Sequence, residues 1–346
     1  MSSLTETAGG RAPQGPAAAA VLPSPGKAGD RVFLGLSTGA AWLIMVILAG
    51  VAIFLIIQAA PAIAANWATN TQIKDPTAGN TVGFANIWTY VGPLIFGTIW
   101  ASFLALLFGA PVALGIALFI SHYAPRRMAG ILGYVIDLLA AVPSVVFGLW
   151  GLYTMRQFLI PFNRFAAENL SWLPFFHGTA SAAGGTILAG AIVLAVMILP
   201  IMTSISREIF LQTPQLHEEA ALALGATRWE MIRLAVFPYA RSGVISAVLL
   251  GLGRALGETM AIAMIVSPKF IYSFVMIGDD NPGTIAANIA LQFGGSNGLQ
   301  RQALIATGLA LFVISFAVNF VARWIVARSA PGTRRTKAPK TKEVAA

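Results

Sequence analysis

The stretch "VLLGLGRALGETMAIAMIV", from Val248 to Val266, is apolar enough to lie inside a lipid bilayer, yet it carries two opposite charges. Arg254 and Glu258 stand four residues apart, so they would share one face of a continuous helix. A lone charge at the centre of a bilayer costs about 2.5–3.5 kcal/mol on insertion scales. Each side chain must therefore face protein, water or an opposite charge, which makes both of them candidates for function.

The rest of the chain is also poor in charge. Of its 346 residues, 57% are hydrophobic and only 10% are Asp, Glu, Lys or Arg, whereas a soluble domain carries about 25% charged residues. With a mean hydropathy of +0.76, the composition predicts an all-α polytopic membrane protein. The absence of cysteine excludes disulfides, thiolate-ligated metals and thiol catalysis.

Six apolar runs are long enough to cross the hydrocarbon core, which takes about 20 residues. We expect six transmembrane helices, at residues 34–60, 93–121, 129–155, 182–206, 242–267 and 303–327. Pro111 and Pro143 predict kinks in the second and third of them. Residues 1–30 and 329–346 are rich in small residues and proline, so we expect disordered cytoplasmic tails on either side of a transmembrane domain at 31–328.

The basic residues predict the orientation, because Lys and Arg gather on the cytoplasmic side of a membrane protein. One side receives most of them: Arg11, Lys27, Arg31, Arg126, Arg127, Arg207, Arg228, Arg233, Arg241 and the tail from Arg323 to Lys342. The other side receives only Lys74, Arg156, Arg164, Lys269 and Arg301. Both termini should face the cytoplasm, and the net charge of +9 is explained without nucleic-acid binding.

The cytoplasmic loop at about 207–241 has helix-start chemistry of its own. In "TPQLHEEAALALGA", Thr213 is the expected cap and Pro214 fits the first helical position, while Gly225 can end the helix. A second short helix should start at Thr227 and stop at Pro238. We expect a helical elbow, which either docks in another protein's groove or rests on the lipid headgroups.

The same loop resembles the EAA loop of ABC-importer permeases. Its segment "EAALALGATRWEMIRLAVFP" has Glu219, Ala220, Ala221, Gly225 and Pro238 in register with that motif. Two further stretches, "DLLAAVPSVVFGLWG" (137–151) and "LGLGRALGETMAIAM" (250–264), closely resemble PstC-type permeases of phosphate ABC importers. The resemblance covers about residues 90–327.

The resemblance implies a type I importer permease fold and a set of partners. The partners would be a second, PstA-type permease, a dimer of a PstB-type cytoplasmic ATPase, and an extracytoplasmic PstS-type phosphate-binding protein. It implies that the elbow residues Glu218, Glu219, Ala220, Ala221 and Gly225 couple this chain to the ATPase. The sequence contains no Gly-x-x-x-x-Gly-Lys-Ser/Thr loop. We therefore expect no cofactor in this chain and a non-catalytic subunit in the cytoplasmic membrane of a bacterium, with ATP and Mg²⁺ bound by the ATPase.

Arg254, Glu258 and Asp137 are the expected substrate-pathway residues. A guanidinium offers several donors to phosphate, and passage requires attraction weak enough for release. The competing interpretation is a structural ion pair between Arg254 and Glu258, or a triad completed by Asp137. Gly253 and Gly257, spaced four apart, predict close helix packing beside this polar face.

Two other functions fit the sequence less well. One is a permease for another oxyanion, such as sulfate or molybdate, and the other is a stand-alone anion channel or carrier that needs no ATPase. An intramembrane enzyme lacks support, because no nucleophile is paired with a base. His122, His177 and His217 are scattered and show no metal-ligand spacing.

Overall fold

The computed structural model describes residues 27–65, 67, 72–74 and 81–329. It divides at Val51 into two units, residues 1–51 and 52–346. In the first unit the described part is helical from Lys27, within α1 (Lys27–Ala64). Most of both predicted tails lies outside the described residues, although residues 27–30 begin α1 and Ser329 ends the last helix.

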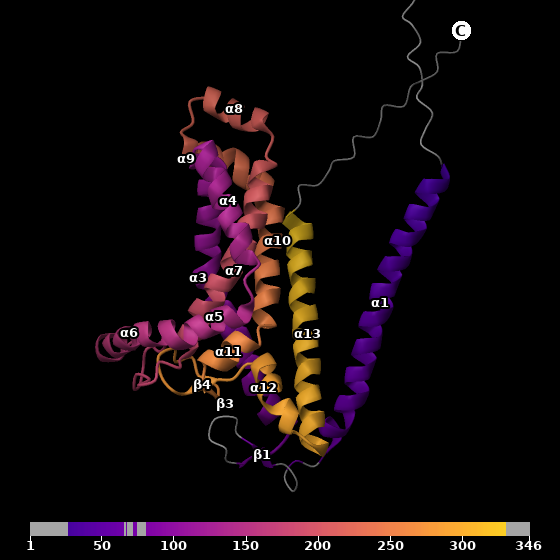
Figure 1. Ribbon diagram of the computed structural model, residues 1–346, viewed down its shortest axis with the longest axis vertical. Helices are drawn as coiled ribbons and strands as arrows, with labels where there is room; N and C mark the ends of the chain where they lie inside the picture. The colour runs from indigo at the N-terminus through magenta and orange to yellow at the C-terminus, as the bar shows by residue number, and fades with distance from the viewer. Residues whose placement is uncertain (1–26, 66, 68–71, 75–80, 330–346) are drawn as a thin grey trace, which may run out of the picture. The chain divides into compact units, whose positions relative to one another are not determined.

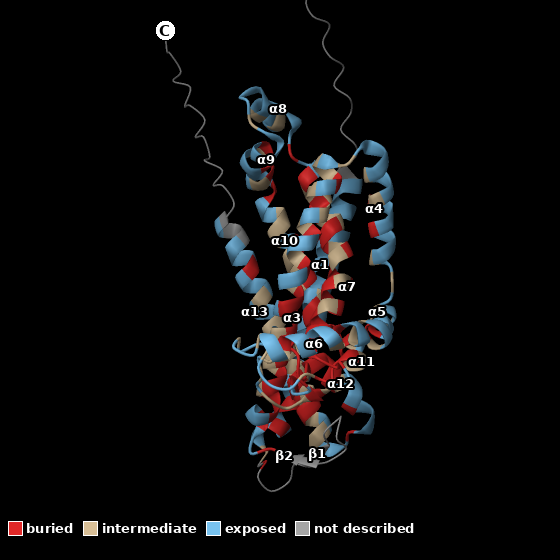
Figure 2. Ribbon diagram, turned by 90° about the vertical axis from the view of Figure 1, so that its left-hand side faces the viewer, coloured by how far each residue is buried: buried red, intermediate tan, exposed pale blue. Residues whose placement is uncertain are grey.

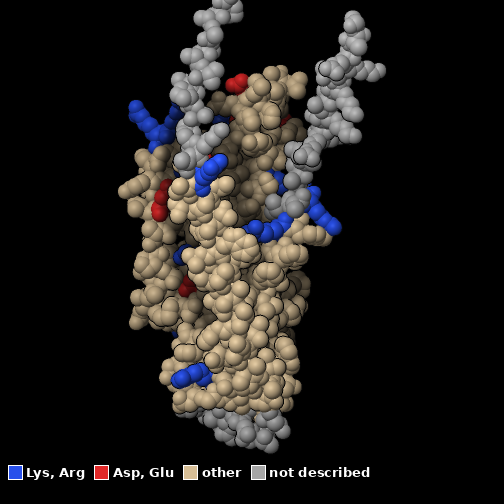
Figure 3. All heavy atoms as spheres, turned by 90° about the vertical axis from the view of Figure 1, so that its right-hand side faces the viewer, with Lys and Arg blue, Asp and Glu red and all other residues tan. Residues whose placement is uncertain are grey.

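The expectation of an all-α membrane protein is confirmed. Among the described residues, five helical stretches are long and apolar enough to span a membrane, and a sixth results if a bent pair of helices is counted as one span. The main helices of these five stretches are α1, α3 (Ile87–Leu118), α7 (Ile187–Leu211), α10 (Phe237–Leu256) and α13 (Gly298–Ser329). Most of the side chains drawn in Figure 3 carry no charge, and a charged side chain that faced lipid would be costly.

The core of the second unit lies along α3, α7 and α10, which pack side by side (Figures 1 and 2). Leu194, Ile198 and Met202 of α7 are fully or almost fully buried there. Gly251 of α10 brings its backbone against Met202, because a Cβ added to Gly251 would lie 2.7 Å from the Met202 sulfur. Close packing therefore occurs at Gly251, whereas the expected pair Gly253 and Gly257 does not supply it: an added Cβ on Gly257 would meet only backbone atoms of the preceding turn, the nearest at 3.6 Å. Gly253 has no atom within 4 Å of an added Cβ and does not pack within the described chain.

The third expected span is broken, which corrects the prediction of one kinked helix at 129–155. The helix α4 (Arg126–Ala140) ends before Pro143, and α5 (Ser144–Trp150), η2 (Gly151–Met155) and α6 (Arg156–Asn169) follow at an angle of 91°. Proline lacks an N–H and disfavours helix in the preceding residue, so Pro143 becomes the N-cap of α5. As a result, α6 runs across the direction of α3 and α7 (Figure 1).

The fifth expected span, at 242–267, is also broken. Its helix α10 ends at Leu256, Gly257 to Thr259 are not helical, and α11 (Met260–Ile265) follows as a separate helix. At the other end the helical run begins earlier than expected, through α9 (Arg228–Met231) and the π-helical turn η3 (Ile232–Val236). Pro238 does not stop the run, because it lies in the first turn of α10, where a missing N–H is tolerated.

Loops at the end opposite the elbow are fixed by buried polar side chains. Asn281 accepts a hydrogen bond from the Ile187 N–H at 2.8 Å and donates one to the Gly185 carbonyl at 2.8 Å. Thr98 accepts a hydrogen bond from the N–H of Ile285 at 3.0 Å. The remaining short elements are α12 (Ile285–Gln292), η4 (Phe293–Gly295), η1 (Phe119–Tyr123), the antiparallel pair β1 (Gln72–Lys74) and β2 (Thr81–Gly83), and the parallel pair β3 (Pro268–Lys269) and β4 (Asn281–Pro282).

Candidate functional site

The elbow forms largely as its local sequence predicts, with exceptions at its start and at Pro238, which does not end the second helix. Its first helix, α8 (Gln215–Ala223), is followed by Gly225 with φ +87°, a conformation that only glycine adopts without strain. Thr227 accepts a hydrogen bond from the Glu230 N–H, and the Glu230 carboxylate accepts one from the Thr227 N–H at 2.8 Å. The expected cap Thr213 is wrong, because Pro214 is the N-cap and Thr213 is buried behind it.

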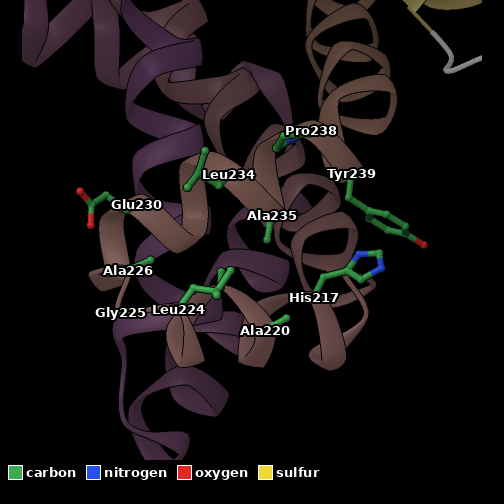
Figure 4. Close-up of a pocket in the computed structure, with 11 residues that line it drawn as sticks. His217, Ala220, Leu224, Gly225, Ala226, Glu230, Leu234, Ala235, Pro238 and Tyr239 are labelled. Atoms are coloured by element: carbon green, nitrogen blue, oxygen red, sulfur yellow. The ribbon is translucent and has the colours of Figure 1, made fainter.

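The outer surface of the elbow is apolar and open. A groove of about 850 Å³ runs between α8 and the helical run that leads into α10. Figure 4 shows Ala220 and Leu224 on one side of it and Leu234 and Ala235 on the other. Leu224 is 90% exposed, which is unfavourable for a leucine unless lipid or a partner covers it. Other large apolar side chains exposed on the elbow include Leu216, Leu222, Trp229, Leu234 and Tyr239.

The five predicted coupling residues divide into two groups. Ala220, Ala221 and Gly225 line the groove, and Glu219 is exposed beside them. Glu218 turns the other way, toward the bundle, and its Oε1 lies 3.4 Å from Nε2 of His122 in η1. The elbow is therefore tied to the end of α3, because η1 continues that helix.

The contact between Glu218 and His122 is not evident from the sequence, in which the three histidines are scattered. The His122 imidazole is almost fully buried and is held from its other side by Ser121, whose hydroxyl oxygen lies 2.7 Å from Nδ1. It also packs edge-on against Phe210 near the end of α7, at 6.5 Å between ring centroids. The only sequence signal was the position of His122 at the cytoplasmic end of a predicted span.

Arg254 lies in the last turn of α10, directly before the break. Its Nε atom is buried and has no hydrogen-bond partner among the described residues. A cation at this end of a helix is stabilised by the helix dipole. The side chain reaches a second groove, of about 820 Å³, lined by Ile201, Ser246, Leu249, Leu250, Gly253, Arg254, Asn319 and Arg323.

Glu258 lies in the break itself and is only 8% exposed. Its Oε1 accepts a hydrogen bond from the N–H of Ala261 at 3.1 Å, so the carboxylate caps the start of α11. Asp137 of α4 is exposed on the bundle surface and accepts a hydrogen bond from the Ser204 hydroxyl at 2.8 Å. In the described part of the chain, no ion pair joins Arg254, Glu258 or Asp137 to one another. The ion pair and the triad of the competing interpretation are therefore absent there: Glu258 lies outside the helix that carries Arg254, and its carboxylate caps α11 instead.

The two broken spans meet. Gly148 of α5 packs so closely on α11 that an added Cβ would lie 3.0 Å from the Ala261 Cα. The stretches 137–151 and 250–264, which are far apart in the sequence, are thereby brought side by side around the break that holds Glu258. Interrupted helices at membrane depth are tolerated where they are buried in protein or line a water-filled cavity, and substrate sites of transporters are commonly built from them.

Comparison with known proteins gives a consistent result. A sequence profile described as "Binding-protein-dependent transport system inner membrane component" matches residues 109–335. The chain is 46% identical over 316 residues to the "Phosphate transport system permease protein PstC 2" of Mycobacterium bovis, which covers 90% of this chain and 95% of that relative. It is 41% identical over 243 residues to the "Phosphate transport system permease protein PstC" of Xylella fastidiosa, covering 68% and 72% of the two chains.

Among solved structures, a chain of a bacterial ABC transporter involved in the import of the acidic polysaccharide alginate is similar, with a TM-score of 0.50 at 16% identity. The match covers 86% of this chain and 99% of that one, and it concerns the fold. The profile and the relatives confirm the family resemblance, and the solved structure supports the expected fold.

Proposed function

Because the chain belongs to the family of binding-protein-dependent transport system inner membrane components, we propose that it is a permease subunit of an ATP-driven importer of inorganic phosphate. The names of its mycobacterial and Xylella relatives support phosphate as the substrate. The observation in the structure that carries the proposal is Arg254, an arginine with an unpartnered Nε at a helix break inside an apolar bundle.

On this proposal, phosphate passes the break between α10 and α11. Arg254 attracts the oxyanion through several N–H donors in one plane. Glu258, as a carboxylate, limits how tightly the anion is held, and it can accept a hydrogen bond from the P–OH of hydrogen phosphate, which sulfate lacks at neutral pH. Asp137 is the third residue assigned to the route; because it is exposed on α4, it would act at the bundle surface.

The elbow would couple this movement to a separate ATPase. Docking in a cleft of the ATPase would bury Leu224 and the other exposed apolar side chains, which explains why they are apolar. ATP binding would then move the elbow around Glu219 and Gly225, and the contact of Glu218 with His122 would pass the movement to α3. ATP and Mg²⁺ belong to the ATPase in this account, and this chain performs no catalysis.

The proposed assembly contains a PstA-type permease beside this chain, two copies of a PstB-type ATPase and a PstS-type binding protein outside. The elbow and the C-terminal end of α13 lie at the same end of the second unit (Figure 1). This arrangement supports a cytoplasmic C-terminus, and we extend the proposal to the N-terminus on the basis of the charge distribution.

Reconstitution in proteoliposomes tests the function. The chain, its permease partner and the ATPase should take up labelled phosphate only with ATP and binding protein, and sulfate should not be taken up in its place. Arg254→Ala and Glu258→Gln variants that assemble normally should both reduce uptake. Uptake by this chain alone would identify a stand-alone carrier, and preference for sulfate would identify a different oxyanion permease.

A further inference from the structure

The groove that Arg254 enters has polar side chains on both of its walls. Its volume is about 820 Å³, and it runs between α10 and α13, which pack against each other in antiparallel directions (Figure 1). Asn319 and Arg323 line it from α13, where their spacing of four residues places them on one face. Ser246 and Gly253 line it from α10 together with Arg254.

The groove is positive and lacks a counter-charge. It receives two guanidinium groups, and none of the described residues that line it is acidic. Neither Arg254 nor Arg323 takes part in an ion pair within the described ranges. Arg254 is half-buried and Arg323 is exposed; two cations that line one groove repel each other, so an anion between them would lower the free energy.

The free donors in the groove fit an oxyanion. Asn319 uses one N–H to bond the Ser315 carbonyl at 2.9 Å and keeps its second N–H. The Ser246 hydroxyl already donates to the Ser242 carbonyl at 2.9 Å and is not a donor to a ligand. Gly253 leaves the wall open, since an added Cβ would meet no atom within 4 Å.

We propose that this groove is a second binding position for phosphate, between Arg254 and the cytoplasm, in which Arg323 and Asn319 hold the anion after it has passed the break. The inference rests on the proposed function and extends it to α13. Arg323 stands six residues before the end of α13 and Arg254 two residues before the end of α10, so the anion would move along the groove from one guanidinium to the other. The phosphate group of a lipid offers the same oxygens, so the experiment must separate the two sources.

The assembled complex of both permeases and the ATPase is placed in nanodiscs of zwitterionic lipid only, without ATP, and binding of radiolabelled inorganic phosphate is measured. Arg323→Gln should weaken phosphate binding about tenfold, the loss expected for one charge-assisted hydrogen bond. Asn319→Leu should weaken it less.

Arg328→Gln is the matched control. It removes the same charge from the same helix, but Arg328 stacks on Trp324 at 3.7 Å and does not line the groove. Its phosphate binding should equal that of the wild type. A Cβ at position 253 would meet no atom within 4 Å, so Gly253→Leu should extend into the open groove and weaken phosphate binding while the thermal stability of the complex stays unchanged.

Equal phosphate binding by Arg323→Gln and Arg328→Gln would overturn the inference. A wild-type complex that transports phosphate but binds none in the absence of ATP would overturn it as well. If Arg323→Gln instead loses only co-purified anionic lipid and binds phosphate normally, the groove is a lipid site. A wild-type complex without ATP-dependent phosphate uptake would refute the proposed function itself, whereas failure of the groove variants alone refutes only the second position.

Discussion

The elbow and the fifth span are both helix–break–helix segments with a glycine at the break, but they break for different reasons. At Gly225 the backbone has φ +87°, and the next helix starts with a capping box at Thr227. At Gly257 the backbone has φ −92°, which any residue adopts. The second break is set by packing of α11 on α5 and by the cap from Glu258. Local sequence determines the first break, and tertiary contacts determine the second.

The largest effect expected from this comparison is at Gly251, in the fifth span. Gly251→Val should destabilise the protein by about 1–3 kcal/mol, because its side chain would overlap the buried Met202 side chain. Thermal unfolding in detergent measures the change. Gly253→Val is the control with the same gain in volume and open space around it. Equal melting temperatures for the two variants would contradict the packing explanation.

A smaller effect is expected at Gly225 in the elbow. Gly225→Ala meets no neighbouring atom, so it should cost only the strain of a left-handed backbone, about 1–2 kcal/mol. The cost should be local and should appear as faster hydrogen exchange of the α8 amides. Asn tolerates this conformation better, so Gly225→Asn should exchange more slowly than Gly225→Ala. Global destabilisation of the bundle would show that the elbow is not an independent local structure.

The cap at the second break comes next. Glu258→Ala should loosen the start of α11 by about 1 kcal/mol, the typical worth of a cap. Glu258→Gln keeps an acceptor oxygen for the Ala261 N–H and should leave α11 intact. Hydrogen exchange of the α11 amides reports whether the cap is kept, and phosphate uptake reports function. If Glu258→Gln keeps the slow exchange of α11 and still loses uptake, the negative charge of Glu258 is the functional property. Identical exchange in both variants would mean that packing alone fixes α11.

The smallest effect is expected for the contact between His122 and Glu218. Pairs of this kind, partly open to solvent, contribute about 0.2–1 kcal/mol, and the two groups are 3.4 Å apart. A double-mutant cycle with His122→Ala and Glu218→Ala, read from thermal unfolding, should give a coupling energy in that range. Glu219→Ala is the control, because Glu219 is exposed and lies outside the contact. If the stability effects of His122→Ala and Glu218→Ala were fully additive, the proposed coupling between the elbow and α3 would be contradicted.

The sequence predicts those parts of the structure that are determined by interactions between residues close together in the chain. The apolar runs identify the spans, and Gly225 and Thr227 predict the turns of the elbow. Arg254 and Glu258 are recognisable because charge is rare in such runs. Their separation is not predictable, since the break at Gly257 depends on α5, more than a hundred residues earlier in the chain.

Other residues of the proposed groove could not be identified from the sequence, because their local context suggests a simpler role. Arg323 stands near the end of a predicted span, where an arginine normally anchors to the interface. Asn319 is a single polar residue in an apolar helix. Only the packing of α13 against α10 brings both residues into the groove with Arg254. Thr213 fails for the opposite reason, because tertiary burial takes its side chain away from the cap position that local rules assign to it.

The unbroken helical run from Arg228 to Leu256 has a mechanical consequence. Treated as a straight rod, its 29 residues are about 43 Å long, with the elbow at one end and Arg254 near the other. A tilt of about 5° about the midpoint of such a rod would displace each end by about 2 Å. A small displacement of the elbow would thereby move the Arg254 side chain, although the two lie at opposite ends of the run.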